Sequence, residues 1–454
     1  MNMKENKNNK KKDGGRRAQA GEGKAGHKQN WKEYTATVED IQNFLMDRLL
    51  LRNNVVSGRV EYKLPTPDPF QEKGSFDSPS LGEGMGWAAL TDVMVNTLWT
   101  ELSAQKKVRA EDIWRVIRSK FVPDFNPFTF YLSQLPPWDG DDYILGMSVS
   151  VTVKGEVEEQ MRFAEYLKKW LVAMVAGWVD ASVVNNVILV LIGEQGAYKT
   201  TWFNYLLPPE LRPYFRIKTN SSTMTKDDLL SLSQYGLVCC EELDTMTQRD
   251  LNQLKSAVTM TSVNERIPYE RFPENRPHIA SFCGTGNNSQ FLNDATGNRR
   301  WLPFEVASIE SPRDHPFDYT NIYAQAYALY RQGFRYWFTR EEIMQLSEHN
   351  RQFEVPRMEV ELVQQYFRRP VGQEPGEFMP VSLALQIVGA GITQKLSSVM
   401  LGRAFRDLGF ERRTSHNVRG YVVVRRSAEE MRALRMAMGA SQPANTDTDD
   451  TDVF

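Results

Sequence analysis

The chain has 454 residues and a nearly balanced charge, with 55 Lys and Arg against 57 Asp and Glu. This length allows about two to four domains with a sizeable core. No apolar run reaches the roughly 18 residues that a membrane-spanning helix needs, and the first residues lack the apolar stretch of a secretory signal. We therefore expect a cytoplasmic protein without a membrane partner.

The two ends of the chain carry opposite charge. Residues 1–30 contain nine Lys and Arg against three acidic residues, and the last fourteen contain four Asp and no base. Such biased segments predict a disordered basic arm over 1–30 and, after a short helix, an acidic disordered tail within 429–454. The arm either contacts nucleic acid or is only a solvated tail.

The segment 31–155 predicts a mainly helical N-terminal domain, with one short hairpin around Ser57-Gly58. Apolar residues recur at helical spacing over Val38–Leu51, Ala89–Leu102 and Arg109–Phe121. The aromatic connector Asn126–Tyr143 either packs against a neighbouring domain or stacks on bases. A long helix, Val157–Trp178, then leads into the next domain, predicted over 156–308.

An apolar run at Val187–Ile192 has the length of a strand and no polar alternation, as a strand buried on both faces would. A glycine-bearing loop, Lys-Thr and a helical pattern follow it, which is the architecture of a phosphate-binding P-loop. Backbone N–H groups would surround the phosphates of ATP, Lys199 would reach the β- and γ-phosphates, and Thr200 would hold Mg²⁺. The predicted nucleotide-binding residues are Gly193, Glu194, Gln195, Gly196, Ala197, Tyr198, Lys199, Thr200 and Thr201.

Tyr198 departs from the usual P-loop pattern, which has glycine at this position. If the position needs a positive φ, the tyrosine is strained by roughly 1–3 kcal/mol, and nucleotide binding would be weakened. Gly196, two positions earlier, is an alternative source of flexibility.

A second apolar strand, Leu237–Cys240, ends in two carboxylates, Glu241 and Glu242. In a P-loop enzyme one such carboxylate, here Glu241, binds Mg²⁺ through water, and its neighbour polarises the attacking water. Only 42 residues separate Lys199 from Glu241, which leaves room for one helix and one strand or loop.

A further buried strand, Ile279–Cys283, is followed by Asn287, which would sense the γ-phosphate if this strand lies beside the P-loop strand. Arg299 and Arg300 then form a pair in a turn. They either contact phosphate, including as an arginine finger across a subunit boundary, or form an ordinary surface salt-bridge pair.

Six motifs carry a resemblance in their order and spacing: GEQGAYKTT, EELD, the Leu254-Lys255 helix, RIPYER, GTGN and DATGNRRW. Together they resemble the virulence-associated E family of P-loop ATPases, close to superfamily 3 helicases, in the form found on Bacteroidetes mobile elements. The resemblance covers roughly Lys168–Val306.

The resemblance implies an α/β P-loop NTPase core with a parallel sheet like that of superfamily 3 and AAA+ proteins. It makes Lys199 and Thr200 the Walker A pair, Glu241 and Glu242 the Walker B acids, Asn287 the sensor, and Arg299 or Arg300 the finger. It also implies a DNA-contacting hairpin. The DNA-binding residues predicted on it and on the preceding helix are Lys255, Arg266, Arg271 and Arg276. No primase domain is visible, so a primase would be a separate partner.

The C-terminal part predicts a helical connector over 309–375 and a winged-helix-like domain over 376–428. Two helices, Ser382–Val388 and Ser397–Leu408, precede two strand-like pieces joined by a polar turn. The basic residues suited to phosphate are Arg403, Arg406, Arg412, Arg413, Arg419, Arg425 and Arg426. The alternative is a small domain for oligomer contacts.

Three functions compete. The first is a DNA-acting ATPase motor of a mobile element, working as a hexamer-like ring on single-stranded or forked DNA with ATP and Mg²⁺. The second is a nucleotide-gated DNA-binding or assembly protein with weak or no hydrolysis, which Tyr198 motivates. The third is a P-loop kinase, against which the twin arginines and the basic C-terminal region argue.

Overall fold

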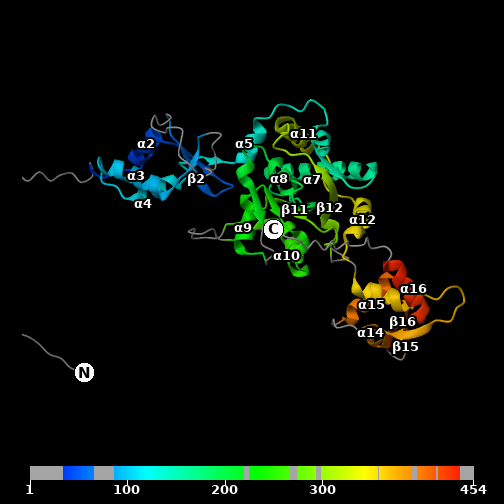
Figure 1. Ribbon diagram of the computed structural model, residues 1–454. Helices are drawn as coiled ribbons and strands as arrows, with labels where there is room; N and C mark the ends of the chain where they lie inside the picture. The colour runs from blue at the N-terminus through cyan, green and yellow to red at the C-terminus, as the bar shows by residue number, and fades with distance from the viewer. Residues whose placement is uncertain are drawn as a thin grey trace, which may run out of the picture. The chain divides into compact units, whose positions relative to one another are not determined.

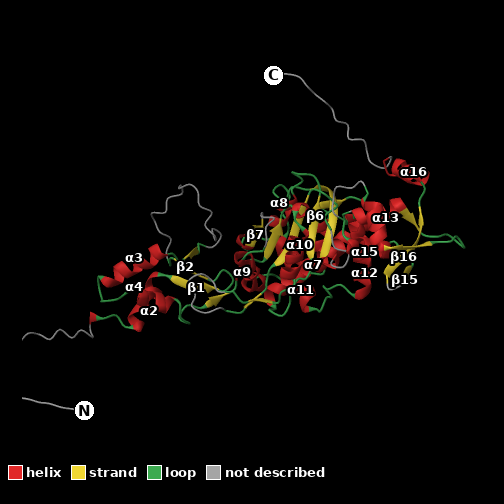
Figure 2. Ribbon diagram, turned by 90° about the horizontal axis from the view of Figure 1, so that it is seen from below, coloured by secondary structure: helices red, strands yellow, loops and turns green. Residues whose placement is uncertain are grey.

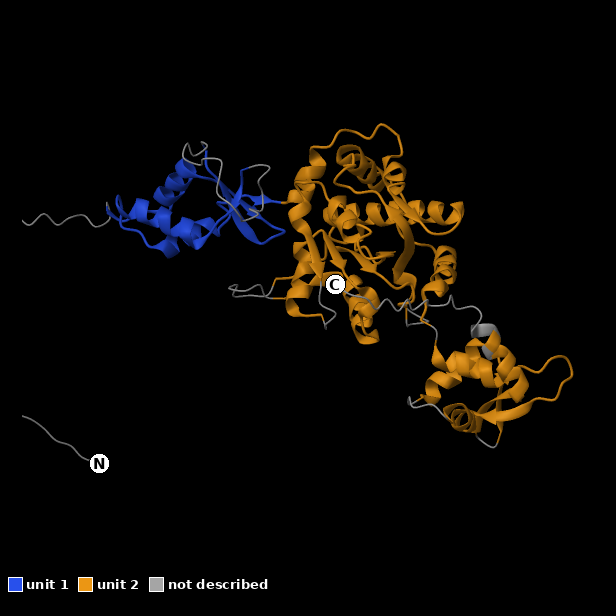
Figure 3. Cartoon of the chain, in the orientation of Figure 1, with its two compact units in different colours: residues 1–125 blue, residues 126–454 orange. Residues whose placement is uncertain are grey.

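The structure is a computed structural model that describes residues 34–65, 86–218, 224–265, 274–292, 298–355, 357–390, 396–415 and 418–439. The chain divides into two compact units, residues 1–125 and residues 126–454 (Figure 3). Each unit is described by itself. Among the described residues, no helix is both long and apolar enough to span a membrane.

The described residues of the first unit form three helices and a small sheet (Figure 1). Strands in the order β3-β2-β1-β4 form the sheet, and β1 and β2 pair as the predicted hairpin, with Gly58 at φ 68°. The predicted helical domain thus contains a sheet as well, because β3 and β4, of two residues each, are too short to leave an alternating pattern. The elements are α2 (Val38–Arg48), β1 (Leu50–Asn54), β2 (Arg59–Lys63), β3 (Ala88–Ala89), α3 (Asp92–Ser103), α4 (Ala110–Ile117) and β4 (Asp124–Phe125).

The helix starts of this unit follow local capping rules. Thr37 caps α2 by accepting a hydrogen bond from the backbone N–H of Asp40, whose carboxylate accepts one from the backbone N–H of Thr37. Thr91 caps α3 by accepting a hydrogen bond from the backbone N–H of Met94. The helices then bury one apolar face each, on a core that includes Leu45, Leu98 and Ile113.

The second unit is built on a six-stranded sheet in the order β5-β12-β6-β11-β8-β7 (Figure 2). All neighbours pair in parallel except β5, which is antiparallel to β12. The prediction of a parallel sheet around the P-loop strand is confirmed. The strands are β5 (Val151–Val153), β6 (Ile188–Ile192), β7 (Phe215–Lys218), β8 (Leu237–Cys240), β11 (Ser281–Gly286) and β12 (Trp301–Ile309).

Helices flank this sheet, and the two central strands are wholly buried. Burial on both faces explains why the β6 sequence is continuously apolar. The long helix α7 is anchored by Trp170, whose Nε1 donates to the carbonyl of Phe282 at 3.0 Å. The helices are α5 (Pro127–Ser133), α6 (Tyr143–Ser148), α7 (Val157–Val179), α8 (Lys199–Leu206), α9 (Lys226–Gln234), α10 (Gln248–Val258), α11 (Tyr319–Arg331) and α12 (Arg340–His349).

A buried ion pair joins α9 to the edge of the sheet. Asp228 accepts hydrogen bonds from Lys218 Nζ on β7 at 2.8 Å and from the backbone N–H of Thr225, the cap of α9, at 3.0 Å. Burial alone would raise the pKa of Asp228, but these hydrogen bonds outweigh burial and lower it. The carboxylate is therefore held in its charged form.

The C-terminal part, from residue 357, has a core of its own that includes Val363, Leu401 and Phe405. Two helices precede an antiparallel pair of strands, in the predicted order, and β16 also pairs with β13 and β14. The elements are α13 (Met358–Tyr366), β13 (Phe367–Arg368), β14 (Glu377–Pro380), α14 (Val381–Gly389), α15 (Ser398–Asp407), β15 (Arg412–Ser415), β16 (Val418–Arg425) and α16 (Ala428–Gly439).

Candidate functional site

The predicted P-loop connects the carboxyl end of β6 to the first residue of α8. Gly193 leaves the strand where β12 comes close: a Cβ at this position would lie 2.7 Å from Cγ2 of Val306. Gly196 has φ 86°, so the loop turns through a left-handed conformation that glycine adopts without strain. The loop conformation thus depends on glycine at both positions.

Tyr198 adopts the left-handed backbone, with φ 57° and ψ 13°, that a glycine would take more readily. Its side chain is 46% exposed, so little packing offsets the strain. Among the described residues, the other non-glycine with positive φ is Glu242, at φ 54°. Both strained residues are themselves predicted site residues, and strain of this kind concentrates at functional sites.

Lys199 spans the loop from the first turn of α8. Its Nζ donates to the carbonyls of Gly193 at 2.6 Å and Glu194 at 2.7 Å, and to Oδ1 of Asn287 at 3.3 Å. Burial lowers the pKa of Lys199, and the nearby Asp244 carboxylate partly opposes this shift. Three backbone and side-chain oxygens therefore surround the ammonium group at the carboxyl edge of the sheet.

The first turn of α8 also reaches the residue that follows β8. The hydroxyl of Thr200 donates to Oε1 of Glu241 at 2.8 Å, although β11 lies between β8 and β6, the strand that precedes the loop and α8. A hydroxyl and a carboxylate fit Mg²⁺, which is usually held by one or two carboxylates together with substrate phosphates and water. The two residues predicted to share the metal are thus in contact.

Asn287 follows β11, which lies directly beside the P-loop strand, as its predicted sensor role requires. Its backbone N–H donates to Oδ1 of Asp244 at 3.2 Å, and that of Asn288 donates to Oδ2 at 3.1 Å. Asp244 therefore fixes the segment from which Asn287 reaches Lys199. Asp244 has no role in the sequence analysis, although an acid four residues beyond the end of β8 was the available signal.

Glu242 begins a short 3-10 helix, Leu243–Thr245, and is exposed. Its carbonyl accepts a hydrogen bond from the hydroxyl of Thr245 at 2.9 Å. The left-handed backbone at Glu242 turns the chain sharply between the strand end and this helix. The strained turn thus directly follows Glu241, whose carboxylate contacts Thr200.

Arg299 and Arg300 lie at the opposite end of the sheet from the P-loop. They precede β12, whose first residue, Trp301, is in register with Ile188 at the start of β6. Four residues of strand, or about 13 Å, separate that level from the P-loop. The structure does not bring these arginines to the nucleotide-site residues of their own chain.

The predicted DNA-binding residues are only partly described. Arg266 and Arg271 lie outside the described residues, and the segments flanking them pair as β9 (Ser262–Val263) and β10 (Arg276–Pro277). Lys255 is 7% exposed, and the Arg276 side chain, 14% exposed, pairs with Glu274 at 3.3 Å. For Lys255 and Arg276 the structure favours a structural role over contact with DNA.

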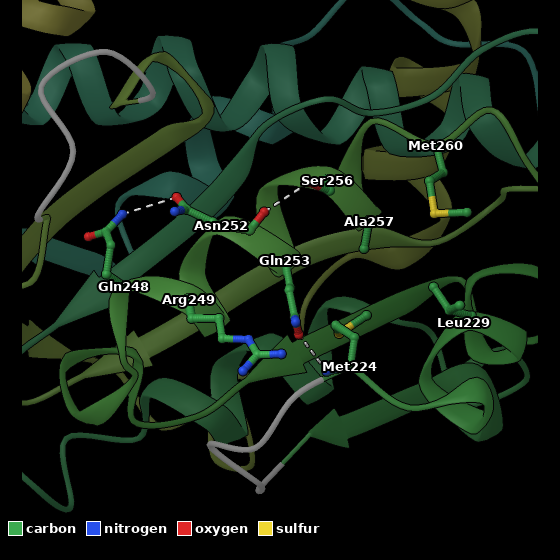
Figure 4. A pocket seen from close by; sticks show the side chains of 9 residues that line it. All are labelled: Met224, Leu229, Gln248, Arg249, Asn252, Gln253, Ser256, Ala257 and Met260. Carbon is green, nitrogen blue, oxygen red and sulfur yellow. Dashed lines mark hydrogen bonds between the residues drawn. The ribbon is translucent and has the colours of Figure 1, made fainter.

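A cavity of about 610 Å³ lies beside α9 and α10, away from the P-loop (Figure 4). Amide side chains on its wall bond within the protein: Gln248 Nε2 donates to Asn252 at 3.0 Å, and Gln253 accepts from the backbone N–H of Met224 at 3.0 Å. None of the predicted site residues lines it. The lining residues are Met224, Leu229, Gln248, Arg249, Asn252, Gln253, Ser256, Ala257 and Met260.

The fold and the site define a parallel α/β protein with a P-loop-type turn after its central strand. Residues 132–355 match the family model of the virulence-associated protein E-like domain, and the chain contains such a domain. The resemblance seen in the sequence over Lys168–Val306 is thereby confirmed and lies wholly within the matched range.

Solved structures with a similar chain path include the apo C-terminal region of NrS-1, at 10% identity and a TM-score of 0.43, covering 85% of this chain and 98% of that chain. The A form of the same region has 11% identity and a TM-score of 0.41, with the same coverage. Likeness at this level supports no inference about function. No curated protein matches the chain.

Proposed function

We propose that the chain is a Mg²⁺-dependent ATPase that acts on DNA, in the manner of a superfamily 3 helicase, during replication of a mobile element. One observation carries the proposal: Lys199, Thr200, Glu241 and Asn287 come from three strand ends and meet at one edge of a parallel sheet. A lysine, a hydroxyl, a carboxylate and an amide in contact at a P-loop are the groups that phosphoryl transfer uses.

Each group has a role that follows from its contacts. Lys199 would exchange its two carbonyl partners for the β- and γ-phosphate oxygens of ATP, since an ammonium gains more from phosphate than from neutral carbonyls. Thr200 and Glu241 would hold Mg²⁺, which neutralises charge on the phosphates. Glu242 would orient the attacking water, and Asn287 would contact the γ-phosphate.

The position of the twin arginines supports an oligomer. Because Arg299 and Arg300 lie a strand length from the P-loop of their own chain, a finger from this pair would have to reach the site of a neighbouring subunit. A ring, hexamer-like in the superfamily 3 manner, supplies such a neighbour to every site. The finger stabilises charge that develops in the transition state.

Two observations support DNA as the partner: the family match and the β9–β10 pair. The virulence-associated protein E-like match covers the sheet, the P-loop and the β9–β10 pair, from which the hairpin would extend toward single-stranded or forked DNA. A primase would be a separate partner, and the complex would work in the cytoplasm. Hydrolysis would move the hairpin against the strand.

A second candidate function is a nucleotide-gated DNA-binding or assembly protein with weak or no hydrolysis. The strained Tyr198 favours it, because a rigid left-handed tyrosine in the loop limits how the loop adapts to a transition state. Both functions predict ATP binding, but only the first predicts rapid ATP hydrolysis.

The test is ATP hydrolysis and ATP binding by the full chain, with and without single-stranded DNA. Lys199→Ala and Arg300→Ala are compared with Lys226→Ala and Arg351→Ala, whose side chains are 83% and 70% exposed. DNA-stimulated turnover that both site variants lose and both controls keep supports the motor. Binding without turnover selects the second function. Absence of ATP binding overturns both.

A further inference from the structure

The C-terminal residues beyond the matched family domain form a basic surface of their own. Helix α15 buries Leu401, Ala404 and Phe405 in the core of this region. Its other side presents Arg403 and Arg406, one turn apart and both exposed. This outer side also carries Val399, which is 65% exposed. Ser398 and Asp407 at the two ends of the helix are exposed as well, and Asp407 pairs with Arg357.

The hairpin of β15 and β16 lies against α15. Tyr421 of β16 stacks on Phe405 with ring centroids 4.9 Å apart, and its hydroxyl donates to the carbonyl of Gly402 at 2.7 Å. Arg412 is in register with Tyr421, and Arg419 lies two residues before it. Since side chains alternate along a strand, both arginines share the face of the hairpin that meets the helix.

These arginine charges are not neutralised within the region. Its four described ion pairs use other arginines: Arg357 with Asp407, Arg368 with Glu374 and Glu430, and Arg425 with Glu377. The exposed arginines of the region outside those pairs are Arg369, Arg403, Arg406, Arg412, Arg413, Arg419 and Arg432. Of these, Arg403 and Arg406 lie on α15, and Arg412, Arg413 and Arg419 lie on the hairpin. Positive charge without a partner on two adjoining elements fits a polyanion.

We propose that residues 396–415 and 418–425 form a binding surface for double-stranded DNA, separate from the proposed ATPase site. Helix α15, ten residues or about 15 Å long, fits the roughly 12 Å major groove of B-DNA and carries Arg403 and Arg406 into it. Arg412 and Arg419 on the hairpin bind phosphates of the adjacent backbone, and Val399 faces the bases at the start of the helix.

The side chains select a duplex over a single strand. Surfaces that bind single strands stack bases on exposed aromatic rings, whereas Phe405, Phe410 and Tyr421 are all buried here. B-form DNA is favoured over duplex RNA because the major groove of A-form helices is too narrow for a helix to enter. DNA binding by this surface requires no nucleotide, so it can be tested independently of the proposed ATPase activity.

The test is fluorescence anisotropy of the full chain with a labelled 30-base-pair duplex and with the matching single strand, over a series of salt concentrations. The double variants Arg403→Ala/Arg406→Ala and Arg412→Ala/Arg419→Ala are compared with a control double variant of two exposed arginines elsewhere, Arg313→Ala/Arg351→Ala. Circular dichroism and thermal unfolding verify that each variant is folded. All substitutions lie on exposed positions, so folding should be retained.

We expect each surface variant to bind the duplex about tenfold more weakly or worse, with the slope of log affinity against log salt reduced by about 1–2. With no nucleotide added, the control should bind the duplex as the unaltered chain does, which separates this surface from the proposed ATP site. Unchanged duplex affinity in both surface variants would overturn the proposal. The proposal would also be overturned if the chain bound the single strand more tightly than the duplex and the same substitutions abolished that binding.

Discussion

The strain at Tyr198 can be measured by replacing the tyrosine with glycine. A non-glycine residue in the left-handed region costs about 1–2 kcal/mol, and glycine gives back about 0.5–1 kcal/mol through the greater freedom of the unfolded chain. Among the described residues the side chain makes no hydrogen bond or ring contact, and it is 46% exposed, so little packing is lost. Tyr198→Gly should therefore stabilise the protein by about 0.5–1 kcal/mol.

A gain of this size raises Tm by about 1–4 °C in a domain of 150–250 residues. Differential scanning calorimetry of the full chain measures it, with Tyr198→Ala as the matched control, because alanine removes the ring and keeps the Cβ atom that causes the strain. The alanine variant should show no gain. Equal Tm values for the two variants would refute the reasoning, since the ring and not the backbone would then set the stability.

Three further predictions concern residues around the site. Gly193→Ala should lower the free energy of unfolding by about 1–3 kcal/mol in urea titration, because the added Cβ would overlap Val306 on β12. An unchanged urea midpoint would show that β12 can shift to make room for it. Asp228→Asn should cost about 3 kcal/mol or more, because it leaves Lys218 buried without its partner. Since the folded pKa of Asp228 is lowered, its contribution is complete above about pH 4 and declines as the pH falls further, so the difference between the chain and the variant should shrink in acid. Asp244→Asn should slow ATP turnover about tenfold, because one of the two backbone N–H groups that orient Asn287 loses its acceptor. Steady-state kinetics measure the change in turnover. An equal loss of ATP affinity would argue for a general defect of the site and against a specific effect on Asn287.

Much of the core could be predicted from the sequence because its signals are local. A strand buried on both faces must be continuously apolar, so Ile188–Ile192 is recognisable without its neighbours. The second strand, Leu237–Cys240, is likewise continuously apolar, and the charged residues Glu241 and Glu242 mark where it ends. Capping residues such as Thr37 and Thr225 likewise set the start of a helix within four residues of sequence.

What depends on strand order could not be predicted. Arg299 and Arg300 follow the predicted sensor Asn287 by 12 and 13 residues. Because β12 runs parallel to β6, its first residue lies at the opposite end of the strands from the P-loop. Lys255 is a basic residue in an amphipathic helix, and its burial follows from which face of α10 meets the sheet. Asp244 gains its contacts only because β11 lies beside β8.

Because β11 lies between β6 and β8, the segments that follow these three strands are neighbours at the site. Strand ends from Ile192, Gly286 and Cys240 lie side by side, so the P-loop, the sensor and the acids occupy neighbouring positions. Asp244 ties the segment after β8 to the segment after β11 through two hydrogen bonds. The strained turn at Glu242 lies only two residues before Asp244. The acids and the sensor, which would contact ATP in either proposed function, are therefore joined through Asp244.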